Sequence, residues 1–117
     1  MDVTPDPSAE AGRRFTVSIR FGEPSVLSVA GETDLESTGP LREAVRAALE
    51  HHPHLVFDLS GVAFADSTFL NVLLEARNAA AERDGSVRLQ NAGTAVQRLL
   101  DVTGAARLFT PVAGEQA

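Results

Sequence analysis

The sequence predicts one α/β domain whose sheet is mixed but mostly parallel, with a β-hairpin at its start and helices packed on it. Apolar residues at positions 15, 17, 19 and 21 alternate with polar ones, which is the pattern of a half-buried strand. Residues 55–59 form a nearly continuous apolar run, typical of a central parallel strand covered on both faces. Apolar stripes at helical spacing lie on either side of that run. The predicted order is β-β-α-β-α-β-α-β.

The first half of the chain predicts a hairpin, a helix and the central strand. A turn at Gly22-Glu23-Pro24 joins the first strand to a second over residues 26–30, and a polar loop follows it. Pro40 suits the first turn of a helix, and Pro53 ends that helical region. The helix stripe consists of Leu41, Ala44, Val45, Ala48 and Leu49. Residues 60–65, after the central strand, are predicted to form a loop.

The second half predicts two more helix–strand units. Asp66 can cap a helix whose apolar face is Leu70, Leu73, Leu74 and Ala81, and Gly85 ends that region. A strand follows at residues 87–90. Thr94 and Gln97 have the spacing of a capping box for a third helix, with a stripe of Val96, Leu99, Leu100 and Thr103. Gly104 ends it, and residues 108–112 form a last strand. The domain is therefore expected at 14–112, between a mobile tail at 1–13 and a second tail at 113–117.

Composition excludes several classes of protein. A formal charge of −6 argues against a nucleic-acid partner, because phosphate backbones require a basic face. The chain contains no Cys and no Lys, which excludes thiolate metal sites and Schiff-base lysines. It also contains no Trp or Tyr, which argues against aromatic stacking platforms for bases or sugars. No apolar run approaches the roughly 18 residues of a membrane span. We expect a cytoplasmic protein with no membrane association and no cofactor.

The sequence contains few candidates for catalytic or metal-binding residues, and none of them forms a convincing set. His51, His52 and His54 are interrupted by Pro53, so their rings share no fixed face, and we expect no metal site. Asp58 in the apolar strand suits a structural hydrogen bond to a loop amide. We expect no hydrolase triad with Ser67, since the histidines fall at the opposite end of the central strand. We expect no catalytic residue and no enzyme activity.

The stretch Asp66-Ser67-Thr68 is the strongest candidate site. It follows the carboxyl end of the central strand and opens a helix, at the edge of an α/β sheet where functional sites concentrate. Ser67 lies on the first helical turn, where backbone amides and the helix dipole favour an anion. Simple N-capping accounts for the same residue types.

These residues resemble the STAS domain, in its anti-sigma factor antagonist form. The family motif Gly-Glu-Leu-Asp is similar to residues 31–34, and Asp-Ser-Ser/Thr-Gly-Leu-Gly is similar to residues 66–71. The likeness extends over residues 15–112, including 87–89 and 96–109. The resemblance differs where Phe69 and Asn71 stand in place of two family glycines, and where Thr33 replaces a leucine at an expected rim position.

The resemblance implies a partner-switching function. Such a protein binds an anti-sigma factor that is also a serine kinase of the histidine-kinase-like ATPase type, and thereby frees a sigma factor. The kinase phosphorylates the motif serine, here Ser67, which ends binding, and a PP2C-type phosphatase resets the switch. The implied switch region consists of Asp34, Asp66, Thr68, Phe69 and Asn71 around Ser67.

Two alternatives remain at this point. A STAS module that is never phosphorylated would act as a constitutive interaction or scaffold domain, docking through Phe69 and the second helix. A small-molecule binder on an α/β scaffold would need a pocket of convergent polar groups, which the sequence does not indicate.

Overall fold

A computed structural model describes residues 15–33 and 37–111. The predicted tails, 1–13 and 113–117, and the switch residue Asp34 lie outside the described residues. Among those described, no helix combines the length and the apolar character that crossing a bilayer requires.

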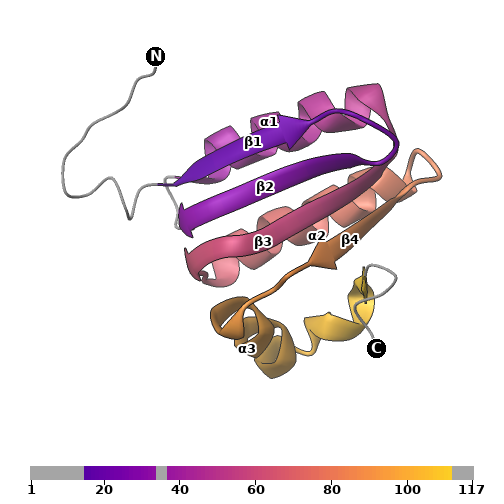
Figure 1. Ribbon diagram of the computed structural model, residues 1–117. Coiled ribbons are helices and arrows are strands. Elements are labelled where there is room, and N and C mark those ends of the chain that lie inside the picture. The colour runs from indigo at the N-terminus through magenta and orange to yellow at the C-terminus, as the bar shows by residue number, and fades with distance from the viewer. Residues whose placement is uncertain (1–14, 34–36, 112–117) are drawn as a thin grey trace, which may run out of the picture.

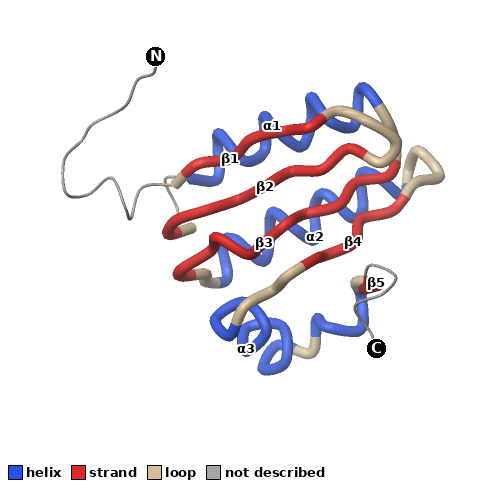
Figure 2. Tube along the Cα trace, viewed as in Figure 1, coloured by secondary structure: helices blue, strands red, loops and turns tan. Residues whose placement is uncertain are grey.

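The sheet has five strands in the spatial order β1-β2-β3-β4-β5 (Figures 1 and 2). β1 (Thr16–Arg20) pairs antiparallel with β2 (Ser25–Glu32), which confirms the predicted hairpin. β3 (His54–Phe64), β4 (Ser86–Gln90) and the short β5 (Thr110–Pro111) each pair parallel with the preceding strand. The sheet is therefore mixed and mostly parallel, as predicted.

The helices cover one face of this sheet. α1 (Thr38–His51) and α2 (Ser67–Ala81) lie behind it in Figure 1, and α3 (Thr94–Thr103) lies beyond β4. The prediction that the central strand is covered on both faces is wrong for the described part of the chain. Strands β2, β3 and β4 advance across the sheet in one direction, so successive right-handed crossovers place both connecting helices on the same side. The other face is called the front face below.

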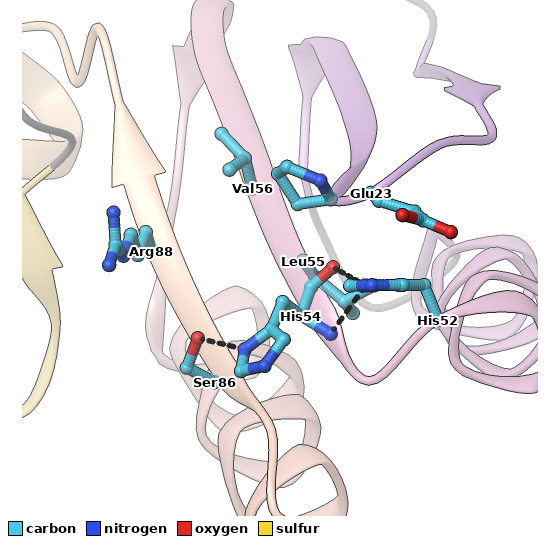
Figure 3. A pocket seen from close by; sticks show the side chains of 8 residues that line it. Glu23, His52, His54, Leu55, Val56, Ser86 and Arg88 are labelled. Carbon is cyan, nitrogen blue, oxygen red and sulfur yellow. Dashed lines mark hydrogen bonds between the residues drawn. The ribbon is translucent and has the colours of Figure 1, made fainter.

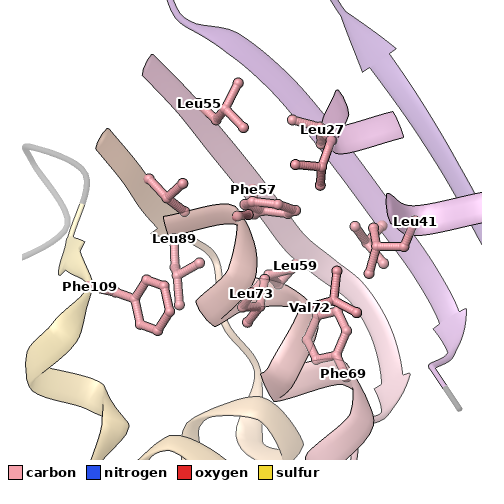
Figure 4. Packing of buried hydrophobic residues seen from close by; sticks show 14 of the residues in the cluster. Leu27, Leu41, Leu55, Phe57, Leu59, Phe69, Val72, Leu73, Leu89 and Phe109 are labelled. Atoms are coloured by element: carbon pink, nitrogen blue, oxygen red, sulfur yellow. The ribbon is translucent and has the colours of Figure 1, made fainter. Parts of the chain in front are cut away.

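The core fills the space between the sheet and the helices (Figure 4). Leu27 and Phe57 are register partners on β2 and β3, and both are buried on the helix side. Their neighbours Ser28 and Asp58 alternate onto the front face. The predicted stripe of α1 is buried throughout, because its residues recur every three or four positions along one side of the helix.

The central strand is longer than predicted. Residues 60–64, expected in a loop, continue β3 and pair with the end of β2. Two register shifts interrupt the pairing, so the apolar alternation that marks a strand is lost there. Gly61 permits the close approach, since a Cβ at this position would lie 2.7 Å from the Cβ of Ala30.

Two predictions for the last third of the chain are corrected. The N-cap of α3 is Gly93, with no side-chain cap, so the capping box of Thr94 and Gln97 is absent. The Gln97 amide instead donates to Asp101 one turn later, at 3.0 Å. Residues 105–108 form a 3-10 helix, η3 (Ala105–Leu108), where the chain turns after Gly104 in the left-handed conformation. Because of this turn the last strand starts at Thr110 rather than at residue 108, and its described part is Thr110–Pro111.

Candidate functional site

Asp66 joins the end of β3 to the start of α2. Its carboxylate oxygen Oδ1 accepts hydrogen bonds from the backbone N–H groups of Thr68, at 3.0 Å, and Phe69, at 3.3 Å. The Thr68 hydroxyl also donates to this oxygen, at 2.6 Å. Asp66 is therefore the N-cap of α2, as its residue type and position predicted.

The Asp66 carboxylate is held in its ionised form. The hydrogen bond from the Thr68 hydroxyl, helped by the two backbone amides, lowers the pKa of Asp66 below its usual value and outweighs partial burial. The sequence suggested that the free amides of this turn would favour an added anion. Two of those amides already bind the protein's own carboxylate, so an added anion would share the helix start with a negative charge.

Ser67 is exposed at the first position of α2. Asn71, four residues later, is exposed as well, and this spacing places it on the same side of the helix. Thr68 is half-buried and its hydroxyl is used by Asp66. The structure thus brings together four of the predicted site residues and separates their roles: Asp66 and Thr68 shape the turn, whereas Ser67 and Asn71 face outward.

Phe69 does not belong to the exposed surface. Its side chain is 1% exposed and lies in the core near Val72 (Figure 4). The prediction that Phe69 contacts a partner directly is therefore wrong. Since α2 packs on the sheet, its third position faces inward while Ser67 faces outward, and the phenyl ring fills space between α2 and the sheet.

Phe64 is a candidate site residue that the sequence prediction missed. It is the last residue of β3, two positions before the N-cap, and its side chain is 49% exposed. Aromatic side chains, Phe among them, are enriched in protein–protein interfaces, so an exposed one beside a candidate site suits contact with a protein partner. The only available signal was a phenylalanine inside a segment expected to be a loop.

Thr33 fastens the end of β2 to the end of β3. Its backbone N–H and its hydroxyl both donate to the carbonyl oxygen of Phe64, at 2.9 and 2.7 Å. The expected rim position of Thr33 is wrong, because the residue is fully buried. These two bonds satisfy its backbone N–H and its hydroxyl and fix the backbone from which Phe64 projects.

The remaining candidates show no catalytic arrangement. Asp58 accepts from the Ser60 amide at 3.0 Å and from the Asn91 side chain at 3.4 Å, in keeping with the structural role expected for it. His52 and His54 lie at the amino end of β3, at the opposite edge of the sheet from Ser67. Across residues 15–33 and 37–111, no group of three or more His, Asp or Glu side chains has a metal-binding arrangement.

Comparisons with known proteins agree on one family. The family model described as "Mlab, STAS domain" matches residues 18–110. The anti-sigma-B factor antagonist of Bacillus subtilis is 33% identical over 91 residues, which are 77% of this chain and 84% of that protein. The crystal structure of an anti-sigma factor antagonist from Mycobacterium paratuberculosis superposes with a TM-score of 0.76 at 27% identity, covering 89% of this chain and 91% of that one. Unphosphorylated SpoIIAA, another anti-sigma factor antagonist, has the same fold, with a TM-score of 0.71 at 17% identity over 88% of this chain and 91% of its own.

Proposed function

Because the chain belongs to the STAS domain family, we propose that it is an anti-sigma factor antagonist whose unphosphorylated form binds an anti-sigma factor and so releases a sigma factor. Phosphorylation of Ser67 ends the binding. The partner carries a serine-kinase domain of the histidine-kinase-like ATPase type, and a PP2C-type phosphatase restores the active form. Ser67 is then a substrate residue, the protein itself is not an enzyme, and it acts in the cytoplasm, where sigma factors work.

The observation that carries this proposal is the exposure of Ser67 directly after the capped start of α2. A kinase can modify only a hydroxyl that its active site can reach. Asp66 holds the backbone around Ser67 through its bonds to the next two amides, so the hydroxyl is presented at a defined place. The Ser67 side chain is not needed for the cap, and its modification leaves those bonds in place.

The surface offered to the anti-sigma factor consists of Phe64, Ser67 and Asn71, which we call the docking patch. All three side chains are exposed, and they come from the end of β3 and the first two turns of α2. Phe64 supplies an apolar anchor, while the Ser67 hydroxyl and the Asn71 amide supply hydrogen bonds at its side.

Phosphorylation changes the docking patch by charge. A phosphoryl group adds about −1.5 to −2 charges at neutral pH. On Ser67 it would stand beside Asp66, whose pKa is lowered by its hydrogen bonds and which therefore stays ionised. In the free protein this charge remains in water. A partner that covers the docking patch would bury the charge without a compensating group, which costs several kcal/mol or more.

The test compares Ser67→Asp with Ser67→Ala. Isothermal titration with the cognate anti-sigma factor measures each affinity, and circular dichroism confirms that each variant is folded. We expect Ser67→Ala to bind the anti-sigma factor within about threefold of wild type. Ser67→Asp is expected to bind about tenfold more weakly or worse, because it places a charge in the interface. A tenfold loss of affinity corresponds to about 1.4 kcal/mol. If folded Ser67→Asp binds as tightly as wild type, the proposed phosphorylation switch is wrong. The protein is then better described as a constitutive interaction module that docks through Phe64 rather than Phe69.

A further inference from the structure

We propose a second binding site, for a small oxyanion, at the edge of the sheet opposite Ser67. A pocket of about 280 Å³ opens there on the front face, at the amino ends of β3 and β4 (Figure 3). Its lining consists of Glu23, Pro24, His52, His54, Leu55, Val56, Ser86 and Arg88. We call it the amino-end pocket. It shares no residue with the docking patch, so the proposal is independent of the phosphorylation switch.

Strand register gathers the polar residues of the amino-end pocket. His54 pairs with Ser86 and Val56 pairs with Arg88 across the parallel β3–β4 ladder. Residues two apart on a strand project to the same face, so all four side chains lie together on the front face. Val56, which is buried, forms the floor between the polar groups. The β1–β2 turn contributes Pro24 and Glu23 as a wall.

His52 supplies a hydrogen-bond donor. Its ring nitrogen Nδ1 lies 3.2 Å from the backbone nitrogen of His54 and 3.4 Å from the His54 carbonyl oxygen. The closer group is an amide that can only donate, so Nδ1 accepts and the ring proton is assigned to Nε2. The Nε2–H group is not used by these contacts and is available to a ligand.

His54 and Ser86 together supply another donor. The Nδ1 atom of His54 lies 2.8 Å from the Ser86 hydroxyl oxygen. If Nδ1 accepts a hydrogen bond from the Ser86 hydroxyl, the ring proton of the neutral imidazole is on Nε2. If Nδ1 is the donor, the Ser86 hydroxyl proton remains free. In either tautomer, one N–H or O–H group of this pair is left for a ligand.

Arg88 supplies the positive charge. Its side chain is exposed and makes no hydrogen bond or ion pair with another residue of the described parts of the chain. A guanidinium group binds carboxylate and phosphate oxygens through parallel N–H donors. Glu23, the one carboxylate of the pocket lining, lies on the far side of the pocket from Arg88 (Figure 3). The charged end of a ligand is therefore expected beside Arg88 and Ser86.

The ligand class follows from these donors and from the size of the pocket. The free donor of the His54–Ser86 pair and the Arg88 cation favour an oxyanion, either a carboxylate or a phosphate group, and the His52 donor lies across the pocket on the Glu23 side (Figure 3). At roughly 30 Å³ for each water, the pocket holds a molecule of about nine heavy atoms. The apolar surface of Val56 and Pro24 suits a short carbon chain or ring attached to the anion.

The test is an NMR titration of the full chain with sodium phosphate and, separately, sodium butyrate, each against sodium chloride at matched ionic strength. We expect at least one probe to give saturable shifts at the amides of residues 54–56 and 86–88. Arg88→Gln is expected to weaken that binding about tenfold, as loss of a charge-assisted hydrogen bond does. Ser86→Ala serves as a second variant should Arg88→Gln alter the fold.

Arg20→Gln is the matched control. Arg20 lies on the same cross-strand row as Arg88, through its pairing with Val26 and that of Val26 with Val56, but it does not line the pocket. The Arg20→Gln variant removes the same charge from the same face. It is expected to change the affinity for the anion less than about twofold, because water and salt screen the interaction between Arg20 and an anion in the pocket. Equal losses in both arginine variants, shifts confined to residues 67–69, or no saturation by either probe would overturn the proposal.

Discussion

At the residue scale, Asp66 has the largest structural role at the start of α2, since one carboxylate oxygen binds two backbone amides and the Thr68 hydroxyl. Asp66→Ala removes this cap and is expected to lower the free energy of unfolding by about 1 kcal/mol. Urea denaturation measures the change. Asp101→Ala is the control, because the Asp101 side chain is exposed on α3 and accepts a surface hydrogen bond from Gln97. If both variants lose the same free energy of unfolding, the Asp66 cap does not stabilise the protein more than an ordinary surface hydrogen bond.

Phe64 and Phe69 differ in what their removal should affect. Phe69→Ala removes a buried ring and is expected to cost about 3–5 kcal/mol of unfolding free energy. Phe64→Ala removes a side chain that is 49% exposed, so its stability cost is expected below about 1.5 kcal/mol, while affinity for the anti-sigma factor falls about tenfold. Denaturation and titration calorimetry on both variants separate these effects. Unchanged binding by Phe64→Ala would remove it from the docking patch.

Residue chemistry explains which parts of the site the sequence predicted. The Asp66 cap depends on local geometry over three residues, so the residue types at positions 66–68 were sufficient. Whether Phe64 or Phe69 faces outward depends on the end of β3 and on how α2 lies against the sheet. Both are tertiary properties that residue type does not encode.

At the scale of elements, the extension of β3 places α2 and therefore Ser67. The extension requires Gly61, where a Cβ would lie 2.7 Å from the Cβ and 3.2 Å from the Cα of Ala30. Gly61→Ala is expected to destabilise the protein by about 1–3 kcal/mol, because β2 and β3 must shift apart. Gly39→Ala is the control, since nothing lies within 4 Å of its added Cβ and alanine favours the helix by up to about 1 kcal/mol. Thermal melting that shows similar shifts for both variants would contradict this role of Gly61.

The elements themselves were predictable, but their ends were less so. Alternation in β1 and the helical stripe of α1 are properties of single segments, and both predictions were confirmed. The end of β3 depends on pairing with β2 across two register shifts, and the start of α3 depends on Gly93 rather than on a side-chain cap. Such boundaries are set by partners distant in the sequence.

At the scale of the whole molecule, carboxylates distributed over the fold make stability depend on pH. Hydrogen bonds from Arg42 and from Thr68 lower the pKa values of Glu75 and Asp66, respectively. Burial, the largest influence on the pKa of Asp58, would raise it, but hydrogen bonds from Ser60, Asn91 and Gln90 outweigh burial and lower it.

Each of these carboxyls has a lower pKa in the folded protein than in the unfolded chain, so the unfolded chain takes up protons first on acidification. Their stabilisation is complete above the unfolded pKa of about 4 and is lost as the pH falls through the folded value. We expect the urea midpoint to fall between about pH 6 and pH 3, and to fall less in Asp66→Asn. A midpoint that is independent of pH in this range would contradict the expectation.

The whole molecule also separates the docking patch from the amino-end pocket. β3 runs from His54 at one edge of the sheet to Phe64 at the other, a span of roughly 30 Å. A charge added at Ser67 is therefore screened from Arg88 at physiological salt, where the Debye length is about 8 Å. Phosphorylation is expected to leave oxyanion binding unchanged.

The central claim is that the phosphorylation state of Ser67 decides whether the partner binds. The most direct measurement isolates the protein from its native cells, maps phosphate by mass spectrometry, and identifies the proteins that accompany the modified and unmodified forms. The account predicts phosphate on Ser67, with a protein of the histidine-kinase-like ATPase type enriched on the unmodified form. A stable partner with no phosphate on Ser67 under any growth condition, or equal recovery of the partner with both forms, would contradict it.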